Sequence, residues 1–131
     1  MKPLDLAWLA GLLEGEGAFH VVRYRTRVGK EIRSRAKITL MMNDKDVIDR
    51  AYSILKPTSK ITFRMRANKL ATMPSYMIQM ESNRAVGWML TLYSFMGTRR
   101  RQQIRQCLQA FLSTPSRRDS SVKNLQACKG Y

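Results

Sequence analysis

The sequence predicts an α+β fold in which a four-stranded antiparallel sheet carries helices on one face and a basic surface on the other. Helical and strand-like hydrophobic periodicities follow one another in the order α-β-β-α-β-β-α-α. The 131 residues include 24 Lys and Arg against 9 Asp and Glu, a net charge of +15. Such a charge opposes compaction unless a polyanion such as nucleic acid is the usual partner. The length suits one domain, which we place at residues 1–115, followed by a basic, loosely held tail at 116–131.

The first helix is expected from Leu4 to about Gly15. Pro3 suits the start of a helix and Asp5 suits its first turn. Apolar residues then recur on one helical face, namely Leu6, Leu9 and Leu13.

A hairpin follows this helix. From Phe19 the side chains alternate with a period of two, Gly29 marks a turn, and the return strand spans Ile32 to Met42. One face of that strand is predicted to be core, and the other is polar and unusually basic, with Arg33, Arg35, Lys37, Thr39 and Met41.

The second half of the chain repeats this order. Asn43 or Asp44 can cap a helix that ends at Pro57. The remaining predicted elements are a hairpin of Ile61 to Ala67 and Tyr76 to Glu81, a helix capped by Ser82 or Asn83 that runs through Met96, and a last helix from about Arg99 to Pro115.

Several classes of protein are disfavoured by composition. The chain has no apolar run of 18 residues, no isolated basic amphipathic helix, and early acids that suit neither a signal nor a transit peptide, so we expect a soluble protein without membrane binding. Two cysteines, Cys107 and Cys128, are too few for a disulfide-stapled secreted domain and favour an intracellular compartment. A P-loop and a Cys-x-x-Cys pair are absent, and the single histidine, His20, cannot form a zinc hydrolase site. We leave His20 without a catalytic role.

The segment Leu9 to Gly17 carries the candidate chemistry. It begins as a helix and ends with two acids, Glu14 and Glu16, where the helix dipole is unfavourable for negative charge. A bound cation would reverse that sign. The Glu16 carboxylate and the Gly15 carbonyl would form part of a ligand set for a divalent metal.

The same helix has a stripe of small residues. Ala7, Gly11 and Gly15 are spaced four apart and so share one face, on which a second helix could approach backbone to backbone.

The nine residues from Leu9 to Gly17 resemble the signature of the LAGLIDADG homing endonucleases. Leu13, Glu14, Gly15 and Glu16 stand where that motif has I-D-A-D. The likeness covers roughly Leu4 to Leu112 and implies the αββαββα fold of that family. In the family, two signature helices pack at a twofold or pseudo-twofold axis, and the second acid binds the catalytic metal. The resemblance therefore places helix packing on Ala7, Gly11 and Gly15, and the metal on Glu16. A single motif implies a C2 homodimer.

The resemblance also assigns a DNA surface and two supporting residues. The basic sheet face would lie in the major groove, with Tyr24, Arg33, Arg35, Lys37, Arg64 and Arg66 as contacts. Arg99 would lie near the scissile phosphate, although the assignment of this basic residue could shift by one position along the helix. Asp44 would orient water or metal, or it caps the second helix; both interpretations stay open.

The implied activity is a staggered double-strand break in a near-palindromic duplex, made by hydrolysis with Mg²⁺ or Mn²⁺ and serving intron or intein homing. No small-molecule substrate is expected. The compartment would be the cytoplasm or nucleoid of a bacterium or phage-infected cell, or an organelle matrix. The alternative is a non-cleaving DNA-binding protein or an intron-splicing maturase of the same fold.

Overall fold

The computed structural model describes residues 1–29, 31–65 and 73–113. Within them the chain forms α1 (Pro3–Glu16), β1 (Gly17–Arg25), β2 (Ile32–Met42), α2 (Lys45–Leu55), β3 (Thr62–Met65), β4 (Pro74–Glu81), α3 (Ser82–Leu92), the 3₁₀ turn η1 (Tyr93–Phe95) and α4 (Thr98–Ser113). The predicted DNA contact Arg66 and the predicted tail at 116–131 lie outside the described residues.

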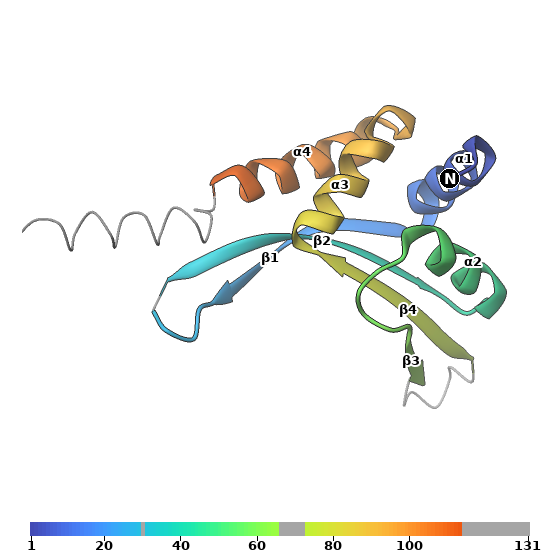
Figure 1. Ribbon diagram of the computed structural model, residues 1–131, viewed down its shortest axis with the longest axis horizontal. Helices are drawn as coiled ribbons and strands as arrows, with labels where there is room; N and C mark the ends of the chain where they lie inside the picture. The colour runs from blue at the N-terminus through green and yellow to red at the C-terminus, as the bar shows by residue number, and fades with distance from the viewer. Residues whose placement is uncertain (30, 66–72, 114–131) are drawn as a thin grey trace, which may run out of the picture.

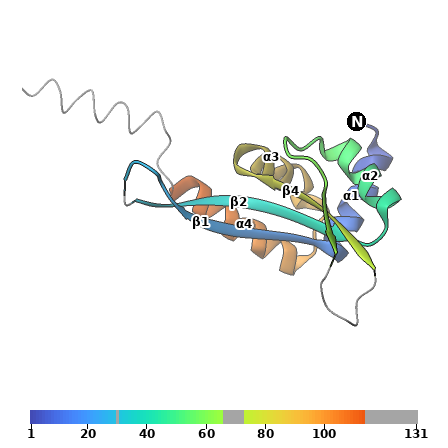
Figure 2. The same ribbon diagram turned by 90° about the horizontal axis from the view of Figure 1, so that it is seen from below.

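The four strands form one antiparallel sheet in the order β1-β2-β4-β3. All of the described helices lie on one side of it, and both hairpins curve away from them, so that the other face is open and concave (Figure 1). Seen from below, α4 crosses behind β1 and β2 (Figure 2). The predicted α+β fold, with helices on a single face of a four-stranded sheet, is confirmed.

The strand register separates the two faces of the sheet. Ala36, Ile38 and Leu40 of β2 are buried on the helix side, and Ile38 lies opposite Phe19 of β1 and Met80 of β4. Directly opposed residues of an antiparallel pair point to the same face. The alternation in the sequence therefore assigned the core face of this strand correctly.

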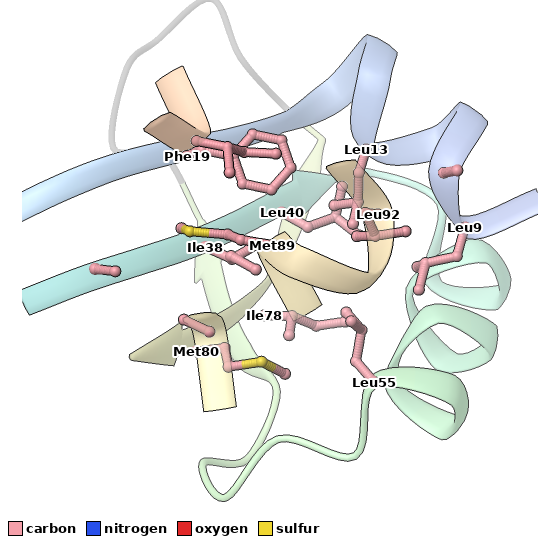
Figure 3. Close-up of a cluster of buried hydrophobic side chains, with 14 of the residues drawn as sticks. Leu9, Leu13, Phe19, Ile38, Leu40, Leu55, Ile78, Met80, Met89 and Leu92 are labelled. Carbon is pink, nitrogen blue, oxygen red and sulfur yellow. The ribbon is translucent and has the colours of Figure 1, made fainter. Parts of the chain in front are cut away.

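The core lies between this face and the helices (Figure 3). Helix α1 contributes Leu9 and Leu13, and α3 contributes Met89 and Leu92, all of them fully buried. Each such side chain stabilises the fold by about 1.5–3 kcal/mol through removal from water. Helix α1 thus packs on the core through one face, and its opposite face is exposed.

Helix α3 is shorter than predicted. It ends at Leu92, and η1 takes up the segment expected to continue it to Met96. The Met96 N–H donates to the Tyr93 carbonyl at 3.3 Å, a tighter closure than that of an α-helix. Arg101 donates to the Tyr93 and Ser94 carbonyls at 3.2 and 3.0 Å, so a side chain of α4 satisfies backbone groups that a longer helix would have paired.

The predicted helix caps also need correction. Ser82 does not cap α3 but is its first residue, with φ of 60°, and Glu81 occupies the N-cap position without a side-chain cap bond. A capping side chain requires an extended backbone, which the left-handed Ser82 lacks. Asp44 does occupy the N-cap position of α2, yet only its carbonyl bonds into the helix, accepting from Ile48 N–H at 3.2 Å.

Candidate functional site

The two acids at the end of α1 have different surroundings. The Glu14 carboxylate accepts a hydrogen bond from the Gly97 N–H at 3.0 Å. Glu16 is exposed, and within the described part of the chain its carboxylate makes no hydrogen bond or ion pair. Glu14 therefore fastens α1 to the start of α4, whereas the oxygens of Glu16 are available to a ligand.

Arg100 supplies a cation at the negative end of α1. Its Nε donates to the Glu14 carbonyl at 3.0 Å and its Nη1 to Gln103 Oε1 at 3.1 Å, and the side chain is only 7% exposed. A cation beside the last carbonyls of a helix is favourable. Sequence reasoning missed this role, although Arg100 lies four residues before Ile104 and seven before Cys107, on the buried face of α4.

Replacing Arg100 should test this structural role. We expect Arg100→Met to lower the free energy of unfolding by about 2 kcal/mol, because hydrogen bonds from a charged group are lost and the Glu14 carbonyl keeps no partner there. Arg99→Met, on the exposed side of the same helical turn, should change it by less than about 0.5 kcal/mol. Urea denaturation followed by circular dichroism measures both, and equal effects would contradict the assignment.

The other predicted catalytic residues lie in the same region of the molecule. Arg99 is exposed and unpaired among the described residues, at the end of α4 that Arg100 and Gly97 join to α1. Asp44 follows β2, whose Leu40 pairs with Gly17 directly after Glu16. No hydrogen bond or ion pair joins Asp44 to Glu16 among the described residues. The Asp44 carboxylate makes no cap bond to α2, and its role toward water or metal remains a prediction.

The small-residue face of α1 is open. Ala7, Gly11 and Gly15 are exposed, and a Cβ built on either glycine would meet no atom within 4 Å. Leu4, 81% exposed, extends the same face by one turn. Gly17 differs, because a Cβ there would lie 2.7 Å from the Leu13 carbonyl oxygen, so close approach of the backbone requires glycine at that position.

Most of the predicted DNA contacts share the concave sheet face. Tyr24 lies opposite Arg33, and Arg64 lies opposite Ser75 of β4. The Arg35 guanidinium stacks 4.4 Å from the centre of the Tyr24 ring. We call the described members of this group the basic face: Tyr24, Arg33, Arg35, Lys37 and Arg64.

Two acids, both absent from the predicted set, pair with the basic face. Glu81 lies 2.8 Å from Arg35 Nη1 and 3.3 Å from Lys37 Nζ, and Glu31 lies 3.4 Å from Arg33 Nη2. The Glu81 contact depends on the β2–β4 pairing, which places Lys37 opposite Glu81. The sequence pattern predicts hairpins but not which hairpins adjoin, so it gave no signal for this cluster.

His20 also lies on the concave face, opposite Lys37. Partial burial, followed by the charge of Lys37, lowers the pKa of His20 from its usual 6.5, while Glu81 acts in the opposite direction. Below pH 6.5 the unfolded chain binds this proton more readily than the folded chain, so stability falls as the pH drops from 6.5 through the folded pKa.

An NMR titration can follow this one histidine. We expect a midpoint below 6.5 in the native protein and an upward shift in Lys37→Gln, because a repelling charge is removed. A midpoint that Lys37→Gln leaves unchanged would contradict the proximity of the two side chains.

Two features are absent from the described residues, a cluster of metal-binding side chains and a membrane-spanning helix. No group of three or more His, Cys, Asp or Glu side chains is placed to hold a metal ion there. None of the helices in the described ranges is both long and apolar enough to cross a membrane.

Comparison with known proteins identifies the fold. No protein-family profile matches the sequence, and no curated protein is significantly similar to it. Solved structures of homing endonucleases do share its architecture, so the chain has the homing endonuclease fold.

Three of these structures illustrate the likeness. I-CvuI, solved with DNA targets in the presence of Mg or Ca, is 20% identical, with a TM-score of 0.62 over 91% of this chain and 73% of that one. The LAGLIDADG homing endonuclease I-GzeII, in complex with its DNA target, is 13% identical, with a TM-score of 0.55 over 91% of this chain and 47% of that one. I-TnaI is 12% identical, with a TM-score of 0.52 over 91% of this chain and 93% of that one.

Proposed function

We propose that the chain is a single-motif LAGLIDADG homing endonuclease, which cuts both strands of a near-palindromic duplex as a homodimer and leaves staggered ends. The observation that carries the proposal is Glu16, an exposed acid without a partner among the described residues, at the end of a helix whose outer face is open and lined by glycine. The homing endonuclease fold supports it, because I-CvuI and I-GzeII were solved in complex with DNA targets.

The concave sheet face is suited to a duplex. It is curved (Figure 1), and the strand register places aromatic and cationic residues of β1, β2 and β3 on it. Arginine and lysine in the major groove can reach guanine edges, and the surrounding cations bind phosphates. Arg66, next to the described end of β3, is proposed to extend the basic face.

A twofold dimer would bring two copies of α1 together along Ala7, Gly11 and Gly15. An isologous contact of this kind places the same residue of each subunit on both sides of the axis. The two Glu16 carboxylates would then lie near that axis, between two basic faces aligned on one duplex. The twofold protein symmetry matches a near-palindromic DNA site.

The residues at the end of α1 fit a divalent metal. Glu16 offers carboxylate oxygens, and Gly15 lies in the last helical turn, where carbonyls lack intrahelical partners. Hard oxygen donors suit Mg²⁺ or Mn²⁺. Such ions, when bound, lower the pKa of an attacking water and stabilise the leaving oxygen. Arg99 would neutralise charge that develops on the phosphate, and Asp44 would orient the water or the ligands.

The test is a cleavage selection with the full chain. The purified protein is incubated with a randomised duplex library, with and without Mg²⁺ or Mn²⁺, and the cut ends are sequenced. We expect near-palindromic sites with staggered ends, formed only when metal is present and suppressed by EDTA. Tight binding of a selected sequence without cleavage in either metal would overturn the proposal and favour the non-cleaving DNA-binding protein or maturase.

A further inference from the structure

An acid lies among the cations of the basic face. Glu81, the last residue of β4, contacts Arg35 at 2.8 Å and Lys37 at 3.3 Å. A surface that binds phosphates gains nothing from a carboxylate that repels them. The position of Glu81 therefore calls for a function other than attraction to DNA.

The backbone around Glu81 restricts where its carboxylate can lie. Glu81 lies opposite Lys37 in the β2–β4 ladder, and the chain turns into α3 at the next residue, Ser82, which has φ of 60°. Its side chain is 31% exposed, which limits its freedom to swing into solvent.

Arg35 is restrained from both sides. The Tyr24 ring stacks 4.4 Å from its guanidinium carbon, and Glu81 pairs with its Nη1. Its Nε is buried and makes no hydrogen bond to another described residue. The guanidinium plane is thus fixed before any ligand arrives, which is the condition for recognition of a base edge by two parallel hydrogen bonds.

We propose that Glu81 is a specificity-determining residue, which holds Arg35 and Lys37 in position for base edges and offsets their charge so that they contribute little to binding of arbitrary DNA. The proposal rests on the DNA-binding function proposed above. It assigns both ion pairs to discrimination between sequences. The Arg35–Glu81 pair, whose side chains are 37% and 31% exposed, adds little to stability.

The experiment compares Glu81→Gln with a matched control, Glu31→Gln. Both substitutions raise the net charge by one, and both acids pair with an arginine of the basic face. The Glu31 side chain, however, is 69% exposed, and among the described residues its carboxylate pairs only with Arg33. Dissociation constants are measured over a series of salt concentrations for a random-sequence duplex and for the duplex obtained by selection with the wild-type protein.

For Glu81→Gln we expect tighter binding of the random duplex. Release of Arg35 and Lys37 to phosphates should steepen the log-log salt slope by up to about 1.8, at about 0.9 for each contact. The ratio of selected to random affinity should fall about tenfold or more, the discrimination of one well-aligned base contact. Glu31→Gln, which releases one cation, should change the slope by at most about half as much and leave the ratio within about twofold.

Each outcome decides between the alternatives. Equal shifts for the two variants would mean that net charge alone acts, and would overturn the role of Glu81. Wild-type protein without salt-dependent DNA binding would instead refute the DNA-binding function itself.

Should Glu81→Gln fail to fold, Glu81→Asp provides the test. It keeps the charge but is one carbon shorter, so we expect a wild-type salt slope with a reduced affinity ratio. An unchanged ratio would overturn the positioning role.

Discussion

Glu16→Gln is expected to abolish cleavage while leaving the fold and DNA binding intact. The amide keeps a similar shape but loses the charge that would hold a divalent metal. This loss should raise the activation barrier by several kcal/mol and so lower the rate about a thousandfold or more. Glu16 is exposed and has no partner among the described residues. The free energy of unfolding should therefore change by less than about 0.5 kcal/mol.

Glu14→Gln is the matched control, because it makes the same chemical change two residues earlier on the same helix. The Glu14 carboxylate bonds to the Gly97 N–H, so this variant should lose about 1 kcal/mol of stability and keep its cleavage rate at temperatures where it is folded. Single-turnover cleavage of the selected duplex and urea denaturation separate the two effects. Cleavage by Glu16→Gln at the wild-type rate would contradict the proposal that Glu16 binds the catalytic metal.

The electrostatic argument from the sequence was incomplete. Two acids at the negative end of a helix indicate a compensating cation, and the predicted cation was a metal alone. The structure provides one from within the chain, because Arg100 contacts the Glu14 carbonyl. The dipole of α1 is thus partly offset without metal. The case for metal binding now depends on the exposed Glu16 rather than on the dipole.

Hydrophobic periodicity in the sequence predicted the features that depend on residues close together along the chain. The alternation in β2 and the 3.6-residue spacing of α1 gave the buried faces correctly, because each depends on neighbours a few residues apart. Long-range partners were missed: Gly97 with Glu14, and Glu81 with Lys37. Both depend on the order of elements in space, which hydrophobic periodicity does not specify.

Gly11→Gln is expected to convert the proposed dimer into monomers and to abolish the proposed double-strand cleavage. Nothing within 4 Å opposes a side chain at this position in the single chain, and glutamine favours a helix over glycine, so the folded monomer should be stabilised by about 0.5 kcal/mol. At a twofold contact the same side chain would separate two helix backbones. Steric exclusion at each of two symmetric sites should raise the dimer dissociation constant about a hundredfold or more.

The control is Gly87→Gln, at a glycine of α3 that is also exposed and has no atom within 4 Å of a built Cβ. Because both positions gain the same polar side chain on an open helical surface, a difference between them can come only from what covers each surface in solution. Sedimentation equilibrium should show a dimer for wild type and Gly87→Gln and a monomer for Gly11→Gln at the same concentration. Loss of cleavage should follow the loss of dimer, since one Glu16 alone leaves half of the proposed metal site. A Gly11→Gln protein that remains dimeric and cuts both strands would show that the subunits contact each other elsewhere. It would also contradict a catalytic centre formed by the two Glu16 residues at an α1 contact.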